Sequence, residues 1–187
     1  KGKWEKKNIK GTELSKKTLG IVGFGNVGVR LSHLVKGFDM KILVCSKSLE
    51  TRKSEYPHVE NASFDDLVSK SDILSFHCKA TPDGKPMLTK DHLKKMKPTA
   101  YIINAARGNI VDEKDLSDAL NEGLIAGAAV DVFSKEPAKE NVLFNNPKVV
   151  LTPHIAASTT EASIVVAEMV ANQISDFLLN GKKLNTV

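Results

Sequence analysis

Short apolar runs alternate with amphipathic stretches along most of the chain. The apolar runs are TLGIVG (Thr18–Gly23), KILVC (Lys41–Cys45), DILSFH (Asp72–His77), AYIIN (Ala100–Asn104), IAGAAVDV (Ile125–Val132) and VVLT (Val149–Thr152). Runs this short and apolar are typical of strands that are buried on both faces. Because they alternate with helical stretches, the sequence predicts an α/β fold: a Rossmann-type doubly wound parallel sheet with right-handed crossovers.

The stretches between these runs show helical spacing of apolar residues. Helices are predicted over Asn26–Lys36, Phe64–Lys70, Lys90–Met96, Glu113–Asn121 and Thr159–Asn180. Asp112 is the expected N-cap of the fourth helix, and Gly123 should end it. For the last helix we expect Ser158 as N-cap, Glu161 in the capping-box position and Gly181 as the end. Its apolar stripe should be buried against the sheet or a partner; the stripe comprises Ile164, Ala167, Val170, Ile174 and Phe177 or Leu178.

Composition supports a single globular domain. The 187 residues are 41% hydrophobic and 26% charged, which is close to globular averages. We divide the chain into a basic lead-in (1–17), a Rossmann domain (18–180) and a C-terminal tail (181–187). The net charge of +5 originates in the lysine-rich lead-in, which we interpret as solvated rather than as a nucleic-acid contact.

The sequence also favours a cytoplasmic location. No uninterrupted apolar run approaches the roughly 20 residues that a membrane span needs, and the N-terminus lacks the pattern of a signal peptide. Cys45 and Cys78 have no disulfide-framework or metal-ligand spacing, so we expect free thiols in a reducing compartment and no metal site.

A glycine-rich turn follows the first predicted strand and opens the first helix. It reads Gly23-Phe24-Gly25-Asn26-Val27-Gly28. In this position the glycines allow a tight turn, close approach of a pyrophosphate and close helix–strand packing, and the helix N-terminus offers N–H groups to the anion. We therefore predict dinucleotide binding, with a purely structural turn as the alternative.

The end of the second predicted strand leaves the choice of cofactor open. A carboxylate that would bind the ribose hydroxyls of NAD is expected here, but the chain has Ser46 followed by Lys47. Lys47 could receive the 2′-phosphate of NADP, or the position could be a tolerant NAD site. The sequence thus predicts NAD or NADP.

Three further residues follow predicted strands and could carry chemistry. Arg107 could bind a carboxylate or a polarised carbonyl, or could clamp a loop. His154 and Glu136 fit a proton-transfer pair, although an isolated histidine beside a helix more often packs than reacts.

Four segments, in order and spacing, resemble the nucleotide-binding domain of the D-isomer-specific 2-hydroxyacid dehydrogenase family. They are GTELSKKTLGIVGFGNVG, INAARGNIVDEKDL, GAAVDVFSKEP and LTPHIAASTTEA. Within the family the likeness is greatest to the enzymes that oxidise 3-phosphoglycerate for serine synthesis. The resemblance implies an oxidoreductase that transfers hydride between a nicotinamide dinucleotide and a D-2-hydroxy acid.

The resemblance also implies roles for single residues. Arg107 would hold the 2-oxo acid, His154 would exchange the proton, and Glu136 would orient His154. The implied cofactor contacts are Gly23, Gly25, Asn26, Val27, Gly28, Ser46, Lys47, Cys78, Ala105, Ala106, Arg107, Asp131, His154 and Ala157, with Asp131 at the nicotinamide carboxamide. Ser46, Lys79 and Ala156 depart from the family pattern, and these departures affect cofactor choice and loop geometry.

The family's substrate domain, built mainly from an N-terminal segment, has no counterpart in this sequence. The 187 residues are therefore expected to form one domain of a two-domain enzyme, poorly active alone, which pairs through this domain as a homodimer. Two alternatives are an NADP-preferring glyoxylate or hydroxypyruvate reductase and a non-catalytic, dinucleotide-responsive module of the corepressor type. No nucleic-acid or membrane partner is expected.

Overall fold

The computed structural model describes residue 2 and residues 11–185. Much of the predicted basic lead-in and the last two residues of the tail lie outside this range. The chain divides into two compact units, residues 1–153 and residues 154–187.

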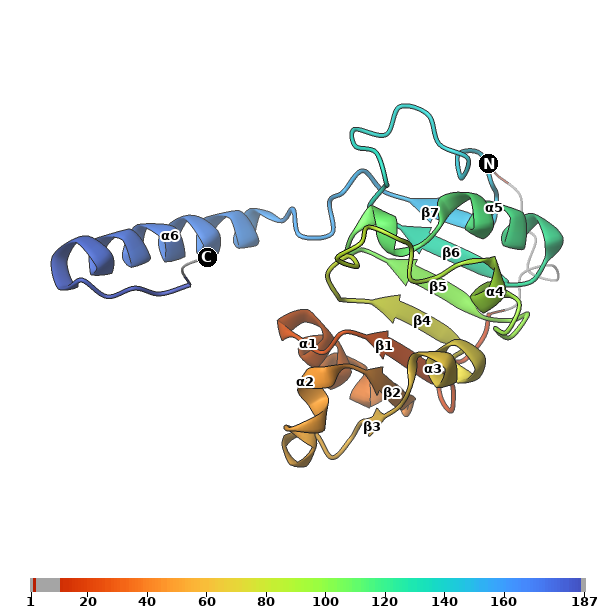
Figure 1. The fold of residues 1–187 in the computed structure, drawn as a ribbon, viewed down its shortest axis with the longest axis horizontal. Helices are drawn as coiled ribbons and strands as arrows, with labels where there is room; N and C mark the ends of the chain where they lie inside the picture. The colour runs from red at the N-terminus through yellow and green to blue at the C-terminus, as the bar shows by residue number, and fades with distance from the viewer. Residues whose placement is uncertain (1, 3–10, 186–187) are drawn as a thin grey trace. The chain divides into compact units, whose positions relative to one another are not determined.

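The first unit contains a seven-stranded sheet whose strands are all parallel (Figure 1). The strands are β1 (Thr18–Val22), β2 (Lys41–Cys45), β3 (Glu60–Asn61), β4 (Ile73–Phe76), β5 (Tyr101–Asn104), β6 (Gly127–Val130) and β7 (Val149–Leu151). Their order across the sheet is β3-β2-β1-β4-β5-β6-β7. The order reverses between β1 and β4, which is where open α/β sheets bind ligands. The predicted doubly wound sheet is confirmed.

The helices of this unit are short. They are α1 (Asn26–Leu34), α2 (Lys47–Glu50), α3 (Phe64–Lys70), α4 (Lys90–Leu93) and α5 (Glu113–Glu122), with 3₁₀ turns η1 (Val35–Phe38), η2 (Lys53–Glu55) and η3 (Gly108–Ile110). Asp112 caps α5 by accepting from the Asp115 N–H at 2.9 Å, and Gly123 ends it at a φ of 73°, as predicted. The two-residue β3 and the one-turn α2 were not predicted, because neither is long enough to show a period.

Two hydrophobic clusters pack other parts of the first unit against the two faces of the sheet. The larger one packs α3, α4 and α5 against one face through Leu67, Leu93, Leu116, Leu120, Phe76 and Ile102. The smaller one covers the other face over β1 and β2 and reaches Ile73 of β4; in it Phe24, Leu49 and Tyr56 pack with Ile21 and Val44.

Among the residues that the structure describes, none buries the second face over β5 and β7. Tyr101 and Val150 are 51% and 67% exposed, and Ile103 on the same face is 37% exposed. The prediction that every strand is buried on both faces is therefore wrong for β5 and β7, whose burial alternates along the strand.

The second unit is dominated by α6 (Thr160–Asn180). Its N-cap is Thr159, whose hydroxyl accepts from the Ala162 N–H at 3.0 Å, so the predicted cap at Ser158 is wrong by one residue. Gly181 ends the helix as predicted, at a φ of 63°. None of its described residues is buried, so the apolar stripe that we expected to be buried lies exposed within this unit.

By length and composition alone, α6 would also suffice to cross a membrane. One 18-residue window has a mean hydropathy of 1.3, although Glu161, Glu168 and Asp176 break the run of apolar residues along the helix. An unbroken apolar run is absent from this helix, so its length and composition do not stand out in the sequence. The same length and apolar character also suit a helix that packs against protein.

Candidate active site

The glycine-rich turn occupies the carboxyl end of β1, at the point where the strand order reverses. Gly23 has a φ of 92°, and a Cβ there would lie 2.6 Å from the His77 carbonyl oxygen. A Cβ on Gly28 would lie 2.3 Å from the Gly23 oxygen, so only glycine lets α1 start this close to the turn. An added Cβ on Gly25, the N-cap of α1, meets nothing within 4 Å. The open side of Gly25 and the N–H groups of the first turn of α1, which includes Asn26 and Val27, fit a pyrophosphate.

The end of β2 is tied to this turn by hydroxyl groups. Ser46 is the N-cap of α2, and its Oγ lies 2.9 Å from Ser48 Oγ. Ser48 donates in turn to the carbonyl oxygen of Phe24 at 3.3 Å. Lys47 is exposed at the start of α2. The position beside the turn thus carries hydroxyls and a cation instead of a carboxylate.

Cys78 follows β4 and lies half-buried, with its Sγ 3.8 Å from Met87 Sδ. Burial raises the pKa of the Cys78 thiol, and Cys45 adds to the rise. Both cysteines are free thiols. A raised pKa keeps Cys78 protonated, so it suits an apolar contact better than nucleophilic chemistry.

Arg107 lies in a turn at the end of β5, and the Asn104 side chain stabilises this turn by hydrogen bonds. The buried Asn104 amide donates to the Arg107 carbonyl oxygen at 3.0 Å, while its oxygen accepts from the Ala106 N–H at 3.1 Å. Arg107 Nη1 donates to the Ala106 carbonyl oxygen at 2.6 Å. Ala105, Ala106 and Arg107 thereby form one fixed corner of the carboxyl edge.

The segment that carries Glu136 packs directly on this corner. A Cβ on Gly108 would lie 1.9 Å from the carbonyl carbon of Phe133 and 2.4 Å from the Ser134 nitrogen, so two backbones touch here. Glu136 Oε1 accepts from the Phe133 N–H at 2.9 Å, which folds the segment back on itself. Arg107 and Glu136 therefore belong to neighbouring segments in contact.

Glu113, at the start of α5, holds the segment that carries Glu136 by hydrogen bonds. Its carboxylate accepts from the Ser134 N–H at 2.7 Å, from Ser134 Oγ at 2.9 Å and from Asn141 Nδ2 at 2.8 Å. Three hydrogen bonds to one charged group make a rigid support. The sequence analysis did not single out Glu113, because nothing local distinguishes it from an ordinary helix-start acid.

Asp131 is buried just beyond β6. Its Oδ1 accepts from Thr152 Oγ1 at 2.5 Å, and its N–H donates to the Asn104 carbonyl oxygen at 2.9 Å. Asp131 is thus joined by hydrogen bonds to the same turn that positions Arg107.

His154 and Ala157 belong to the second unit. His154 is exposed within this unit and has a φ of 56°, and the following residues form a turn in which Ser158 N–H donates to the Ile155 oxygen at 2.9 Å. Of the predicted residues, the structure gathers those from Gly23 to Glu136 along the carboxyl edge of one sheet, while these two lead into α6.

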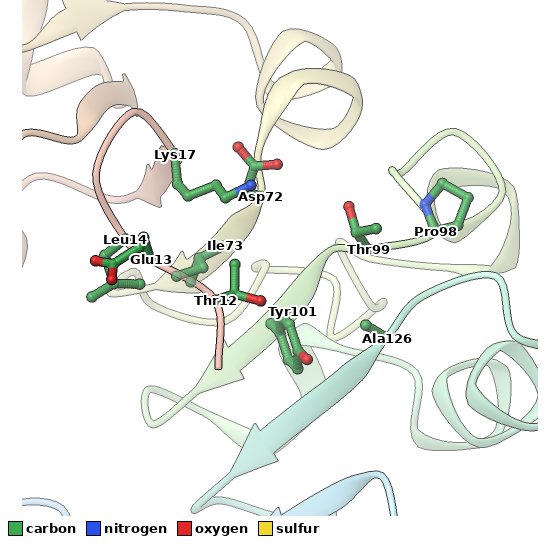
Figure 2. A pocket seen from close by; sticks show the side chains of 10 residues that line it. All are labelled: Thr12, Glu13, Leu14, Lys17, Asp72, Ile73, Pro98, Thr99, Tyr101 and Ala126. Atoms are coloured by element: carbon green, nitrogen blue, oxygen red, sulfur yellow. The ribbon is translucent and has the colours of Figure 1, made fainter. Parts of the chain in front are cut away.

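A different hollow opens at the opposite, amino edge of the sheet (Figure 2). Its volume is about 590 Å³, and its lining includes Lys17, Asp72, Thr99 and Tyr101. None of the predicted site residues lines it. The chemistry predicted from the sequence is therefore confined to the carboxyl edge and the second unit.

The chain was compared with known proteins. The model of the family "D-isomer specific 2-hydroxyacid dehydrogenase, NAD binding domain" matches residues 1–156. The chain is 42% identical over 177 residues to a D-3-phosphoglycerate dehydrogenase of Synechocystis sp., covering 95% of this chain and 32% of that protein. It is 40% identical over 183 residues to a glyoxylate reductase of Pyrococcus furiosus, covering 94% of this chain and 54% of that protein.

Among solved structures, that of a glyoxylate reductase from Paecilomyes thermophila matches with a TM-score of 0.84. Its sequence is 31% identical, and the match covers 94% of this chain and 53% of that one. The chain thus spans between a third and about half of the length of these relatives.

Proposed function

The chain belongs to the D-isomer specific 2-hydroxyacid dehydrogenases, as the NAD-binding domain of that family, and from this premise we propose that it serves hydride transfer between a nicotinamide dinucleotide and a D-2-hydroxy acid. The substrate that we propose is 3-phosphoglycerate, oxidised to 3-phosphohydroxypyruvate in the synthesis of serine.

One observation carries the proposal: the backbone contact at Gly108 joins the Arg107 turn to the segment of Glu136. This contact lies at the carboxyl edge of the sheet, the edge that also bears the glycine-rich turn. The Arg107 guanidinium and the Glu136 carboxylate are held by separate hydrogen bonds at this edge. This arrangement suits a reaction in which an anionic substrate binds next to a nicotinamide ring.

The residues of the first unit fit the cofactor. The open face of Gly25 and the N–H groups of Asn26 and Val27 would hold the pyrophosphate, and Asp131 would accept from the carboxamide. When bound, the nicotinamide ring supplies the acceptor or donor of the hydride.

The proton is the task of the protein's own side chains. In reduction, Arg107 binds the carboxylate and polarises the carbonyl of the 2-oxo acid, and His154 gives a proton to the carbonyl oxygen. In oxidation, His154 takes the proton from the hydroxyl. Glu136 would orient the imidazole of His154 and fix its tautomer. These three roles follow the family resemblance residue by residue.

A glyoxylate or hydroxypyruvate reductase is the second candidate. It is favoured by a relative of that kind at 40% identity and by the absence of a carboxylate at Ser46. The identity of 42% to a phosphoglycerate dehydrogenase supports the first candidate. A corepressor-like module is the third, and the presence of Arg107, Glu136 and His154 together speaks against it.

We also propose that the protein is cytoplasmic and forms a homodimer through this domain. The exposed apolar residues of α6 support an association, because exposed apolar stripes of this size mark interfaces.

The test measures reduced nicotinamide by its absorbance in a protein that joins this chain to its substrate domain. We expect oxidation of 3-phosphoglycerate to be favoured over that of D-glycerate. The His154→Ala variant should lose about 10²–10⁴-fold in turnover and keep its cofactor affinity. Full turnover in this variant would refute the proton-transfer role, and a preference for glyoxylate or hydroxypyruvate with NADPH would decide for the second candidate.

A further inference from the structure

A groove beside the glycine-rich turn has two arginines, Arg30 and Arg52, in its lining. It has a volume of about 360 Å³ and runs between α1 and the segment that follows α2. Asn26, Arg30 and His33 line it from α1, at spacings that place them on one face of that helix. Arg52 and Tyr56 line the opposite wall, and Gly25 forms the end next to the proposed pyrophosphate position.

The wall that carries Arg52 is fixed to the glycine-rich turn through Phe24. The buried Phe24 ring meets the Tyr56 ring edge-on, with centroids 5.1 Å apart, and the Phe24 carbonyl oxygen accepts from Ser48. The Arg52 guanidinium lies 5.0 Å from the centre of the Tyr56 ring and donates to its hydroxyl. Arg52 is therefore held in a set place relative to Gly25.

The contacts of Arg52 leave it able to bind an anion. Its Nε and Nη2 groups donate to Glu55 at 3.1–3.3 Å, and both side chains of this pair are about half exposed. An exposed pair of this kind is weak and screened by salt, so a dianion can compete with Glu55. The Nη1 group takes no part in these contacts and is oriented by the same planar fork.

NADP differs from NAD only by a phosphate monoester on the adenosine ribose. Selecting it requires cations that can reach the phosphate and no carboxylate at the residue that would face the ribose hydroxyls, because a carboxylate at that residue repels the phosphate. Ser46 supplies the second condition, because it stands directly after β2 where that carboxylate is expected. The cations are Lys47, which follows Ser46 in the sequence, and Arg30 and Arg52, which line the groove next to Gly25.

We propose that this groove receives the 2′-phosphate of the adenosine ribose, so that Arg30 and Arg52, together with Lys47, make the site select NADP(H). The inference rests on the proposed function, since it needs a dinucleotide at the glycine-rich turn.

The experiment titrates the 187-residue chain calorimetrically with NADPH and NADH, and with 2′,5′-ADP and 5′-AMP as probes of the adenosine half alone. We expect tighter binding of each ligand that bears the 2′-phosphate. Arg52→Gln and Arg30→Gln should each weaken NADPH binding about tenfold and leave NADH binding within about twofold. Lys41→Gln removes the same charge at the far end of β2 and should change neither.

Arg52→Gln also loses the contact with Tyr56, so Arg30→Gln and the retained NADH affinity show whether an effect is specific to the phosphate. NADH binding as tight as NADPH binding, or variants that weaken both cofactors equally, would overturn the inference and leave the proposed function intact. Binding of neither cofactor would refute the proposed function itself.

Discussion

Gly108 sets how closely the Arg107 turn approaches the segment of Glu136. Glycine is required at this position by the lack of space and not by a positive φ. An added Cβ would lie within 2.4 Å of three backbone atoms of Phe133 and Ser134. Backbone atoms cannot give way as the end of a flexible side chain can. The geometry of the candidate site therefore depends on the smallest side chain at this one residue.

Gly108→Ala should push the two segments apart. We expect the free energy of unfolding to fall by about 1–3 kcal/mol and, in a protein that contains the substrate domain, kcat/KM to fall strongly. Gly37→Ala is the matched control, because a Cβ there meets nothing within 4 Å, and it should leave both quantities nearly unchanged. Urea denaturation and steady-state kinetics provide the two measurements. Equal behaviour of both variants would contradict the role of the backbone contact.

At the scale of elements, Asp72 joins three strands at the amino edge of the sheet, beside the hollow of Figure 2. Its carboxylate accepts from the Thr18 N–H at 2.8 Å and lies 3.0 Å from Lys97 Nζ. Its backbone bonds to Thr18 and Tyr101 at 2.8 and 2.9 Å. Partial burial would raise the pKa of Asp72, but the Thr18 hydrogen bond and Lys97 together hold it below the usual value.

This lowered pKa predicts how stability depends on pH. Because the folded pKa lies below the unfolded one, the carboxylate stabilises the fold fully above about pH 4 and loses this contribution as pH falls through the folded pKa. Asp72→Asn should therefore lower the free energy of unfolding by about 1–3 kcal/mol near neutral pH, with a smaller difference in acid. Asp65→Asn, which breaks an exposed pair with Lys95, should cost less than about 1 kcal/mol. Urea denaturation across this pH range decides; a difference that grows in acid would contradict the assignment.

At the scale of the whole molecule, both units expose apolar side chains. In the first unit these are Tyr101, Ile103 and Val150 on the open face of the sheet. In the second they follow α6 from Ile164 to Leu179. Exposed apolar side chains that are grouped in this way mark surfaces where proteins associate.

The proposed homodimer predicts that the chain self-associates through the apolar stripe of α6. Ile174→Glu places a charge in the stripe and should shift the molar mass, measured by light scattering after size exclusion, toward that of a monomer. Asn172→Glu adds the same charge on the other side of the helix and should leave the mass unchanged. A monomer at every concentration of the unmodified chain, or equal effects of both variants, would rule out this interface.

Much of the fold could be predicted because its determinants are local. Each strand longer than two residues lies within a predicted apolar run. Helix α5 begins after its N-cap Asp112 and ends at Gly123. The shape of the glycine-rich turn could be predicted as well, because Gly23 and Gly28 are close in sequence as well as in space. The α6 cap was misplaced because Ser158 and Thr159 are adjacent and chemically alike, and only the backbone decides which one accepts from Ala162.

What the sequence determined by itself was the order of elements and the residue types at the end of each strand, because both depend on neighbours along the chain. The tertiary structure alone decided that the Gly108 backbone touches Phe133, that Glu113 supports the same segment and that Arg52 faces α1 across a groove. It also decided that Tyr101, Ile103 and Val150, on one face of β5 and β7, are left exposed by the described part of the chain. These features join residues about twenty or more positions apart, or depend on which helix covers which face, and no local pattern encodes such contacts.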